Sequence, residues 1–289
     1  MKIKIAFCIS NFSQGGAETQ FWNLVRGLDR NRFDVHVIQI ENKGRRAVIR
    51  RLDNTKLHTI CARFQLDPVA VLAIRKYIKR NRIQILQSFL FMDNQFARVV
   101  GALCRIPVVT SVRGELRPIL GTLKTFIEYR MRFLSDRIVT NSGWLKSELV
   151  GGGAEADRVE VIYNGVDVST LACGIPGVEI RSSLGLEEDA RYIGIVARFH
   201  PMKDHETFFK AAKNLMESDS AIRCLVLGGG SEEVRIREYI SDLGIQDRVL
   251  LVGEVRSDIG CWYRAMNVLM LTSRWGESFP NVILEAMSC

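Results

Sequence analysis

The sequence predicts an α/β protein built from two doubly wound, Rossmann-like domains in series. Short β-rich runs alternate with helical patterns along the whole chain. The chain has 289 residues, which is enough for two domains at ~150 residues each. The alternation fails once, over residues 167–180, where Gly and Pro cluster as in a linker. We therefore place one domain at 1–172 and a second at 173–289.

The first domain begins with an apolar run at 2–9, which predicts a buried strand. A Gly15-Gly16 turn and a helix near 17–28 follow it. Further strands are expected at 33–40, 82–89, 106–112, 136–142 and 158–164. Further helices are expected at 68–80, 94–104 and 118–134. Strands that alternate with helices form parallel sheets, which bind ligands at the carboxyl ends of their strands.

The second domain repeats this alternation on a smaller scale. Its strands are expected at 191–197, 222–229, 248–253 and 267–273. A helix is expected at 204–218, and a last helix starts near Phe279, with Ser278 as its cap and Pro280 in its first turn. We expect this domain to be incomplete, because its final strand would keep an open edge.

The charge of the chain is uneven. The formal net charge is +8, with +12 in residues 1–172 and −4 in residues 173–289. A basic first half favours an anionic partner, and the basic stretch at 73–82 makes an anionic membrane the expected one. Nucleic acid is not expected, because this stretch has one aromatic residue, Tyr77, and no stacking array. A solvated surface without a partner is the alternative.

The seven cysteines are scattered without a C-x-x-C pair, and most lie in apolar runs. We expect reduced thiols in a reducing compartment rather than a disulfide framework. No apolar run approaches the ~18 residues of a membrane span. The N-terminal apolar run is too short for a signal peptide, so we expect a cytoplasmic protein.

Three short motifs predict an anionic ligand. The glycines of SQGGAETQ (13–20) allow a close backbone approach at a helix start, although Gly-Gly is also common in ordinary turns. In VARFHPMKDHETF (196–208), Arg198 and Lys203 follow a strand end and suit a diphosphate, or are surface charges. His200 and His205 lack a third ligand, so zinc is not expected.

The third motif closes the chain. In GESFPNVILEAM (276–287), Glu277 precedes a helix start and Glu285 lies within the helix. Backbone amides at Phe279, Asn281 and Val282 can bind a phosphate, and carboxylates accept hydrogen bonds from sugar hydroxyls. The pair suggests a sugar–phosphate ligand, whereas the simpler interpretation is a loop charge and a solvated helix face. The chain has no D-x-D pair, Walker lysine or G-x-S-x-G elbow, so we expect no metal and no other cofactor.

Taken together, these residues resemble the retaining glycosyltransferases of family 4, which have the GT-B fold. The resemblance covers nearly the whole chain, and ESFPNVILEAM is its most specific part, with glutamates separated by seven residues. The matching segments are GGAE (15–18), NS (141–142), YNGVD (163–167), ARFHPMKD (197–204), VLGGG (226–230), VGEV (252–255) and ESFPNVILEAM (277–287).

The resemblance implies a nucleotide-diphosphate sugar as donor. Glu285 would bind the ribose, and Glu277 would bind the transferred sugar. The backbone N–H groups of Ser278, Phe279 and Asn281 would bind the diphosphate. Arg198 and Lys203 would neutralise the leaving diphosphate. Val255 would lie against the base, Gly15 and Gly16 near the phosphates, and Glu18 near the acceptor. These implied donor-site residues are Gly15, Gly16, Arg198, Lys203, Val255, Glu277, Ser278, Phe279, Asn281 and Glu285.

Two features differ from the family pattern. Arg113 stands where many relatives have a histidine, so it either takes a charge role near the sugar or marks a different acceptor site. The chain also ends where relatives continue, so we expect residues 1–289 alone to aggregate without turnover. The expected activity is hexosyl transfer to a glycan or lipid-linked acceptor in surface polysaccharide synthesis. The alternatives are a sugar-nucleotide epimerase of the same fold and an inactive remnant that binds nucleotide sugar weakly.

Overall fold

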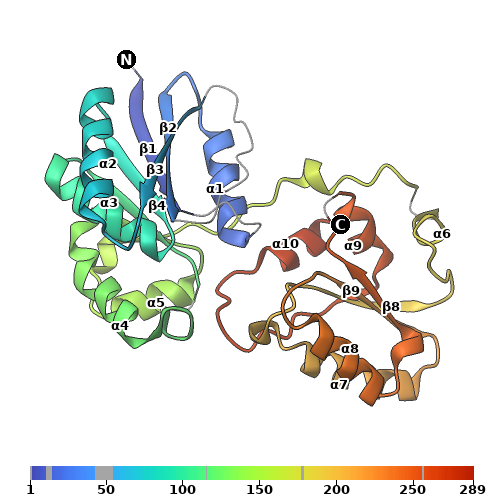
Figure 1. Ribbon diagram of the computed structural model, residues 1–289. Coiled ribbons are helices and arrows are strands. Elements are labelled where there is room, and N and C mark those ends of the chain that lie inside the picture. The colour runs from blue at the N-terminus through green and yellow to red at the C-terminus, as the bar shows by residue number, and fades with distance from the viewer. Residues whose placement is uncertain (1, 11–14, 43–54, 115, 177–178, 256) are drawn as a thin grey trace. The chain divides into compact units, whose positions relative to one another are not determined.

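The chain folds into two compact units, shown in Figure 1: an N-terminal unit, Met1–Gly165, and a C-terminal unit, Val166–Cys289. The structure is a computed structural model that describes residues 2–10, 15–42, 55–114, 116–176, 179–255 and 257–289. Each unit is an open parallel sheet with its own core, so the prediction of two Rossmann-like domains is confirmed.

The N-terminal unit is a seven-stranded parallel sheet in the order β3-β2-β1-β4-β5-β6-β7. Its strands are β1 Ile3–Ile9, β2 Phe33–Asn42, β3 Lys56–Ala62, β4 Ile85–Phe89, β5 Val108–Val112, β6 Arg137–Thr140 and β7 Val159–Val161. Its helices are α1 Gly16–Gly27, α2 Pro68–Asn81, α3 Phe91–Cys104, α4 Leu116–Met131 and α5 Gly143–Gly151, with 3-10 turns η1 Arg132–Leu134 and η2 Ala156–Arg158.

Strand β1 explains why the first apolar run is continuous. Phe7 and Ile9 point to the face that α1 covers, whereas Ala6 and Cys8 point to the face covered by α2 and α3. A strand buried on both faces shows no polar alternation. Strand β3, the edge strand beside β2, is not predicted from the sequence, because its exposed positions interrupt the apolar run.

The C-terminal unit is a four-stranded parallel sheet in the order β10-β9-β8-β11. Its strands are β8 Arg191–Val196, β9 Ile222–Leu227, β10 Val249–Gly253 and β11 Val268–Leu269. Its helices are α6 Ile180–Ser183, α7 His205–Ser218, α8 Glu233–Asp242, α9 Ile259–Ala265 and α10 Asn281–Ser288, with 3-10 turns η3 Val168–Leu171, η5 Pro201–Lys203 and η6 Gln246–Arg248.

The last strand is shorter than the sequence predicts, and the last helix starts later. Strand β11 has two residues instead of the predicted run over 267–273. Beyond Met270 the chain turns to the loop after β8, where Thr272 and Arg274 form hydrogen bonds. Helix α10 begins at Asn281, with Pro280 at its cap position in an extended conformation, so the prediction of a Ser278 cap is wrong. A residue that precedes proline avoids the helical region, which moves the helix start past Phe279.

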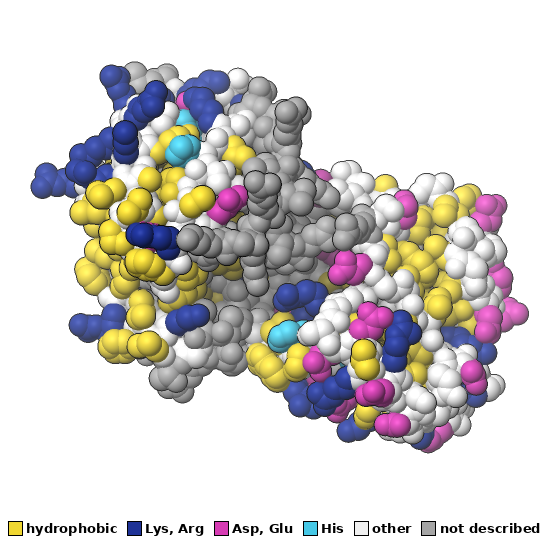
Figure 2. Space-filling view, viewed as in Figure 1, with side chains coloured by type: hydrophobic (Ala, Val, Ile, Leu, Met, Phe, Trp, Pro, Cys, Tyr) yellow, Lys and Arg dark blue, Asp and Glu magenta, His cyan; other side chains and the backbone are white. Residues whose placement is uncertain are grey.

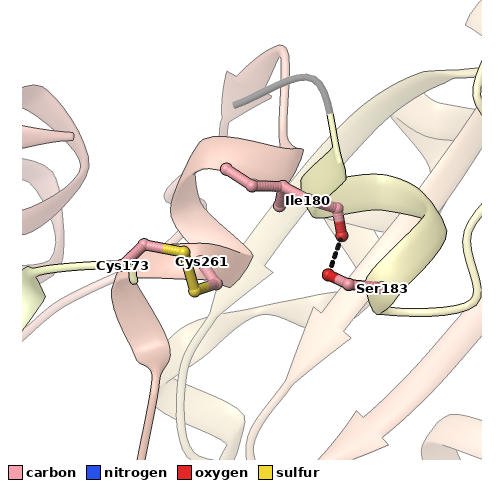
Figure 3. Close-up of a disulfide and its surroundings, with 4 residues drawn as sticks. All are labelled: Cys173, Ile180, Ser183 and Cys261. Carbon is pink, nitrogen blue, oxygen red and sulfur yellow. Dashed lines mark hydrogen bonds between the residues drawn. A yellow bond between two sulfur atoms is a disulfide. The ribbon is translucent and has the colours of Figure 1, made fainter. Parts of the chain in front are cut away.

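The expectation of reduced cysteines is corrected at one pair. Figure 3 shows a disulfide between Cys173, which follows η3, and Cys261 of α9. Their Cα atoms are 5.1 Å apart, a separation that suits a disulfide. Gly260 lies against the backbone carbonyl of Leu171, where a Cβ would overlap the oxygen, so the two segments are also tightly packed. No helix among the described residues has the length and apolar character that crossing a membrane requires.

Candidate functional site

Both sheets reverse their strand order at one point, and several of the predicted site residues follow the strands there. In the C-terminal unit the reversal lies between β8 and β11. Lys203 lies in the loop after β8, and Glu277 lies in the loop after β11. In open α/β sheets, ligands bind in the crevice at this point. The topology therefore brings together two charged residues that lie 74 positions apart in the chain.

Lys203 and Glu277 form an ion pair between the Lys203 ammonium and Glu277 Oε1. Their side chains are 15% and 25% exposed, so the pair is largely shielded yet reachable from solvent. Ser273 Oγ donates a second hydrogen bond to Glu277 Oε1, at 3.3 Å. Within the described ranges no contact to Glu277 Oε2 is formed, and a carboxylate oxygen of this kind can accept a hydrogen bond from a sugar hydroxyl.

A clamp between the two loops holds this pair in place. Arg274 donates through Nε to Asp204 Oδ2 at 2.7 Å, and its backbone N–H donates to the Met202 carbonyl at 2.9 Å. Thr272 Oγ1 donates to the carbonyls of Lys203 and Asp204, both at 3.0 Å. Burial raises the pKa of the Asp204 carboxyl, but hydrogen bonds from Thr207 and Arg274 outweigh it and keep the pKa below its ordinary value. A charged Asp204 therefore ties the two loops together near neutral pH.

The loop after β9 needs its glycines for close packing against the Arg198 loop. Gly228 and Gly230 have φ angles of 141° and 151°, which L side chains rarely adopt. A Cβ at Gly228 would overlap the carbonyl oxygen of Ala197, and one at Gly230 would lie 2.6 Å from the carbonyl oxygen of Phe199. Arg198 itself is exposed, and the part of the chain that the structure describes contains no ion pair to it.

Glu285 is held by a residue that the sequence analysis missed. Tyr263 of α9 donates its hydroxyl to Glu285 Oε2 at 2.7 Å. Tyr263 is 5% exposed, and burial together with the Glu285 charge raises the pKa of its phenol strongly. The phenol thus stays a donor at all ordinary pH values, and it fixes one oxygen of the carboxylate. Val255 is half-buried. It packs against an apolar cluster that includes Cys261 and Ala265 of α9.

His205, which starts α7, is not a candidate metal ligand or acid. It is 5% exposed and packs edge-on against Phe199, with ring centroids 5.1 Å apart. Burial, helped by the nearby Lys203 charge, lowers the pKa of His205 to about 4. Among the described residues there is no group of three or more His, Cys, Asp or Glu side chains that could hold a metal ion.

In the N-terminal unit, the glycine turn is built around Glu18. Gly15 occupies the cap position of α1, and Gly16 is the first helical residue. A Cβ at Gly15 would lie 2.4 Å from the end of the Glu18 side chain, so a larger residue there would displace the carboxylate. Glu18 is 7% exposed, so the structure places it inside the turn rather than on the surface.

Three of the predicted site segments meet in the N-terminal unit. Gln20 of α1 and Gly165 form two hydrogen bonds, at 2.7 Å and 3.0 Å, which tie α1 to the YNGVD segment. Arg113, after β5, donates to Asn164 Oδ1 of the same segment at 2.6 Å and lies over the Phe89 ring at 5.1 Å. Burial lowers the pKa of Arg113 to about 10, so the guanidinium stays charged at neutral pH. Arg113 thus supplies positive charge at the carboxyl edge of the first sheet.

Asp93 is a second residue that the sequence analysis missed. It lies in the first turn of α3 and is fully buried, and among the residues that the structure describes neither carboxyl oxygen has a hydrogen-bond partner of good geometry. Burial raises its pKa to about 8, with a smaller opposing effect of Ser10 and a further rise from Glu18. Asp93 is therefore protonated at neutral pH. It lies just after β4 in a stretch without a motif, so no pattern along the chain pointed to it.

Two Rossmann-like units with charged loops at the carboxyl edges of their sheets define a class of two-domain α/β proteins that bind ligands at those edges. Two family models match this chain: Glycosyltransferase Family 4 over residues 14–170 and Glycosyl transferases group 1 over residues 178–289. The chain belongs to glycosyltransferase family 4, so the predicted resemblance is confirmed.

Curated relatives match part of the chain. D-inositol 3-phosphate glycosyltransferase of Mycobacteroides abscessus is 30% identical over 162 residues, which cover 54% of this chain and 35% of that protein. The protein of the same name from Kribbella flavida is 32% identical over 166 residues, which cover 54% of this chain and 39% of that protein. The aligned parts thus span little more than a third of these relatives.

Solved structures match almost the whole chain. Anabaena HepE in complex with UDP and glucose has a TM-score of 0.83 at 20% identity, and the match covers 99% of this chain and 78% of that one. The lipopolysaccharide outer core galactosyltransferase WaaB, in its apo form, has a TM-score of 0.73 at 18% identity, with 99% and 78% covered. These neighbours confirm the GT-B fold.

Proposed function

We propose that this protein is a retaining hexosyltransferase that moves a sugar from a nucleotide-diphosphate sugar to a glycan or lipid-linked acceptor. The reaction would contribute to the synthesis of a surface polysaccharide. It would take place at the cytoplasmic face of a membrane. Family membership supports the transferase class, and the retaining course follows the family pattern. The HepE structures contain UDP and UDP-glucose, which supports a nucleotide sugar as the donor.

The observation that carries the proposal is the pairing of Lys203 with Glu277 at the switch point of the second sheet. One loop supplies a cation and the other a carboxylate, and the Asp204–Arg274 clamp fixes the distance between them. A donor sugar diphosphate needs both groups. The diphosphate needs positive charge as it leaves, and the sugar hydroxyls need acceptors.

The remaining donor-site residues follow from this arrangement. Glu285, fixed through Oε2, would accept the ribose hydroxyls with its other oxygen. The backbone at Ser278, Phe279 and Asn281, ahead of and at the start of α10, would bind phosphate oxygens through N–H groups, and Arg198 would add charge. On the N-terminal unit, Gly15 and Gly16 would face the phosphates, Glu18 would contribute to the acceptor side, and Arg113 would act near the sugar. We propose that no metal takes part.

A donor and acceptor screen tests the proposal. The chain, alone and extended by the C-terminal units of a relative, is incubated with radiolabelled UDP- and GDP-sugars and with lipid-linked glycans, and inositol phosphate is included because of the relatives' names. We expect the extended protein to transfer sugar from one donor, unaffected by EDTA, and NMR of the product should show the anomeric configuration of the donor. Transfer with inversion would contradict the retaining course.

The same screen separates the alternatives. An epimerase of the same fold would convert the donor sugar without any acceptor, which NMR of the nucleotide sugar detects. A weakly binding remnant would bind UDP or GDP in calorimetry and yet transfer nothing to any acceptor. Absence of both binding and turnover for every donor would reject the proposed donor site.

A further inference from the structure

We propose that helices α2 and α4, with η1, form a docking face for a bilayer that contains anionic lipid. This surface of the N-terminal unit deepens the proposed function, since it places the enzyme where a lipid-linked acceptor would be. Its evidence is independent of the donor site. It consists of two stripes of exposed side chains, here called the docking face: Val69, Leu72, Lys76 and Lys79 on α2, and Leu123, Phe126, Arg130 and Phe133 on α4 and η1.

On α2, the exposed stripe begins apolar and ends basic. Val69 and Leu72 are both more than half exposed, although apolar residues of a surface helix ordinarily face the core. Lys76 and Lys79 continue the stripe, because spacings of three and four residues keep side chains on one face of a helix. The opposite face of α2 supplies the core residues, including Ile74.

On α4 and η1, the same spacing recurs. Leu123, Phe126 and Phe133 are 72%, 61% and 70% exposed, and Arg130 lies between the last two. Their positions are separated by three, four and three residues, as in the α2 stripe. Three large apolar side chains exposed to this extent on one short segment are unusual for a protein surface in water.

The two stripes belong to helices that lie on either side of α3. Helix α3 packs against α2 on one side and against α4 and η1 on the other, and it exposes Leu103 near its end. Figure 2 shows hydrophobic and basic side chains gathered at the left of the view, over the region where Figure 1 places α2 and α3. Apolar and basic groups thus share one surface of this unit.

The part of the chain that contains α2, α3, α4 and η1 exposes few acidic side chains. Between residues 63 and 137, the described part of the chain contains Asp67, Asp93, Glu128 and Asp136. The first three are at most 2% exposed, and Glu128 is paired with the buried Arg98. Only Asp136 among these four is exposed. The surface left over is basic and apolar, which complements a bilayer of anionic headgroups above acyl chains.

Sedimentation with vesicles tests the docking face. The chain is mixed with vesicles of equimolar phosphatidylglycerol and phosphatidylcholine, or of phosphatidylcholine alone. We expect binding to the anionic vesicles, which weakens as salt screens the charges. The variant Leu123→Ser/Phe126→Ser/Phe133→Ser should bind at least ten-fold more weakly at low salt, and Lys76→Glu/Lys79→Glu should lose about five-fold or more per changed charge.

A matched control carries the same kind of change elsewhere. Leu215, Val234 and Leu250 are exposed apolar residues of the C-terminal unit, and their triple serine variant should bind vesicles like the unchanged chain. In a second measurement, the emission of Phe126→Trp should be blue-shifted and quenched by brominated lipid beyond the emission of the unchanged chain with its four tryptophans, because the new ring enters the acyl region. This readout does not depend on any loss of binding.

Several outcomes would overturn the docking face. They are equal binding to neutral vesicles, unchanged binding of the triple α4–η1 variant, or an emission of the Phe126→Trp variant that lipid does not alter. Self-association without lipid that the triple variant abolishes would assign the surface to a second copy instead. Sugar transfer to a short soluble acceptor should be unaffected by the triple variant. That assay distinguishes a failure of the docking face from a failure of the proposed activity.

Discussion

At the scale of single residues, the charged groups of the two units are controlled by their neighbours. Glu277 is paired with Lys203, Glu285 is fixed by a buried phenol, and Arg113 is oriented by Asn164. At Asp93, in contrast, burial outweighs the smaller effect of Ser10, so this carboxyl group is neutral at pH 7. The pKa of each carboxyl group depends on its burial and on its partners. A substitution that changes a single polar atom should therefore alter stability or ligand affinity measurably.

Asp93→Asn should change how stability depends on pH. The carboxyl has a pKa near 3.8 when unfolded and about 8 when folded. Below pH ~4 both states are protonated, and between pH ~4 and ~8 only the unfolded state releases the proton. The free energy of unfolding therefore falls with rising pH, by up to ~1.4 kcal/mol per pH unit from this group. The asparagine variant lacks this loss.

Urea denaturation at pH 5 and pH 8 measures the effect. We expect Asp93→Asn to gain stability relative to the unchanged chain on going from pH 5 to pH 8. The exposed residue Asp189 provides the control, since Asp189→Asn should follow the unchanged chain at both pH values. A pH dependence that Asp93→Asn leaves unaltered would mean that the buried carboxyl is charged.

Tyr263→Phe removes only the hydroxyl that donates to Glu285. A carboxylate that loses a fixed partner samples more orientations, so UDP should bind about three- to ten-fold more weakly, in line with a lost hydrogen bond of ~0.5–1.5 kcal/mol. Isothermal calorimetry checks this, and Tyr239→Phe, on α8 of the same unit, serves as the control. Equal UDP affinity of Tyr263→Phe and the unchanged chain would remove Tyr263 from the site.

At the level of helices and strands, the Lys203–Glu277 pair is supplied by the loops that follow β8 and β11. The alternation of apolar runs predicted most of the helices and strands, because parallel strands buried on both faces give continuous apolar runs. It failed for β3 and for the end of β11, where edge exposure and the hydrogen bonds of Thr272 to the neighbouring loop determine the structure. Contacts of this kind join residues about 70 positions apart, so no local pattern announces them.

The candidate site follows the same logic. Lys203, Glu277 and Glu285 carried motif signals because their residue types and spacing are readable along the chain. Tyr263 and Asp93 carried none, because their roles depend on burial and on partners from other elements. The disulfide could not be predicted from the sequence either, because Cys173 and Cys261 are 88 residues apart and belong to no motif.

The disulfide should stabilise the C-terminal unit. Closing an 88-residue loop restricts the unfolded chain, so Cys173→Ser should lower the free energy of unfolding by ~2–4 kcal/mol. Cys61→Ser, which changes an exposed free cysteine, should have a small effect. Thiol titration in denaturant without reductant should find five free thiols, at Cys8, Cys61, Cys104, Cys224 and Cys289. Seven reactive thiols would show that the bond does not form.

At the scale of the whole molecule, the two units divide the chemistry. The C-terminal unit carries the Lys203–Glu277 pair and Glu285, which are proposed to bind the donor. The N-terminal unit carries Arg113, the glycine turn and the docking face. The charge difference between the two halves of the sequence matches this division, because the basic half is the one with the exposed basic and apolar stripes.

We propose that the C-terminal unit binds a nucleotide diphosphate through Lys203. Isothermal calorimetry of the chain with UDP and with GDP measures this binding. Charge-assisted hydrogen bonds contribute ~1.5–3 kcal/mol, so Lys203→Ala should weaken the preferred nucleotide by about ten-fold or more. Lys210→Ala, which changes an exposed lysine of α7 in the same unit, should leave the affinity unchanged. Equal affinity of Lys203→Ala and the unchanged chain for both nucleotides would contradict the account.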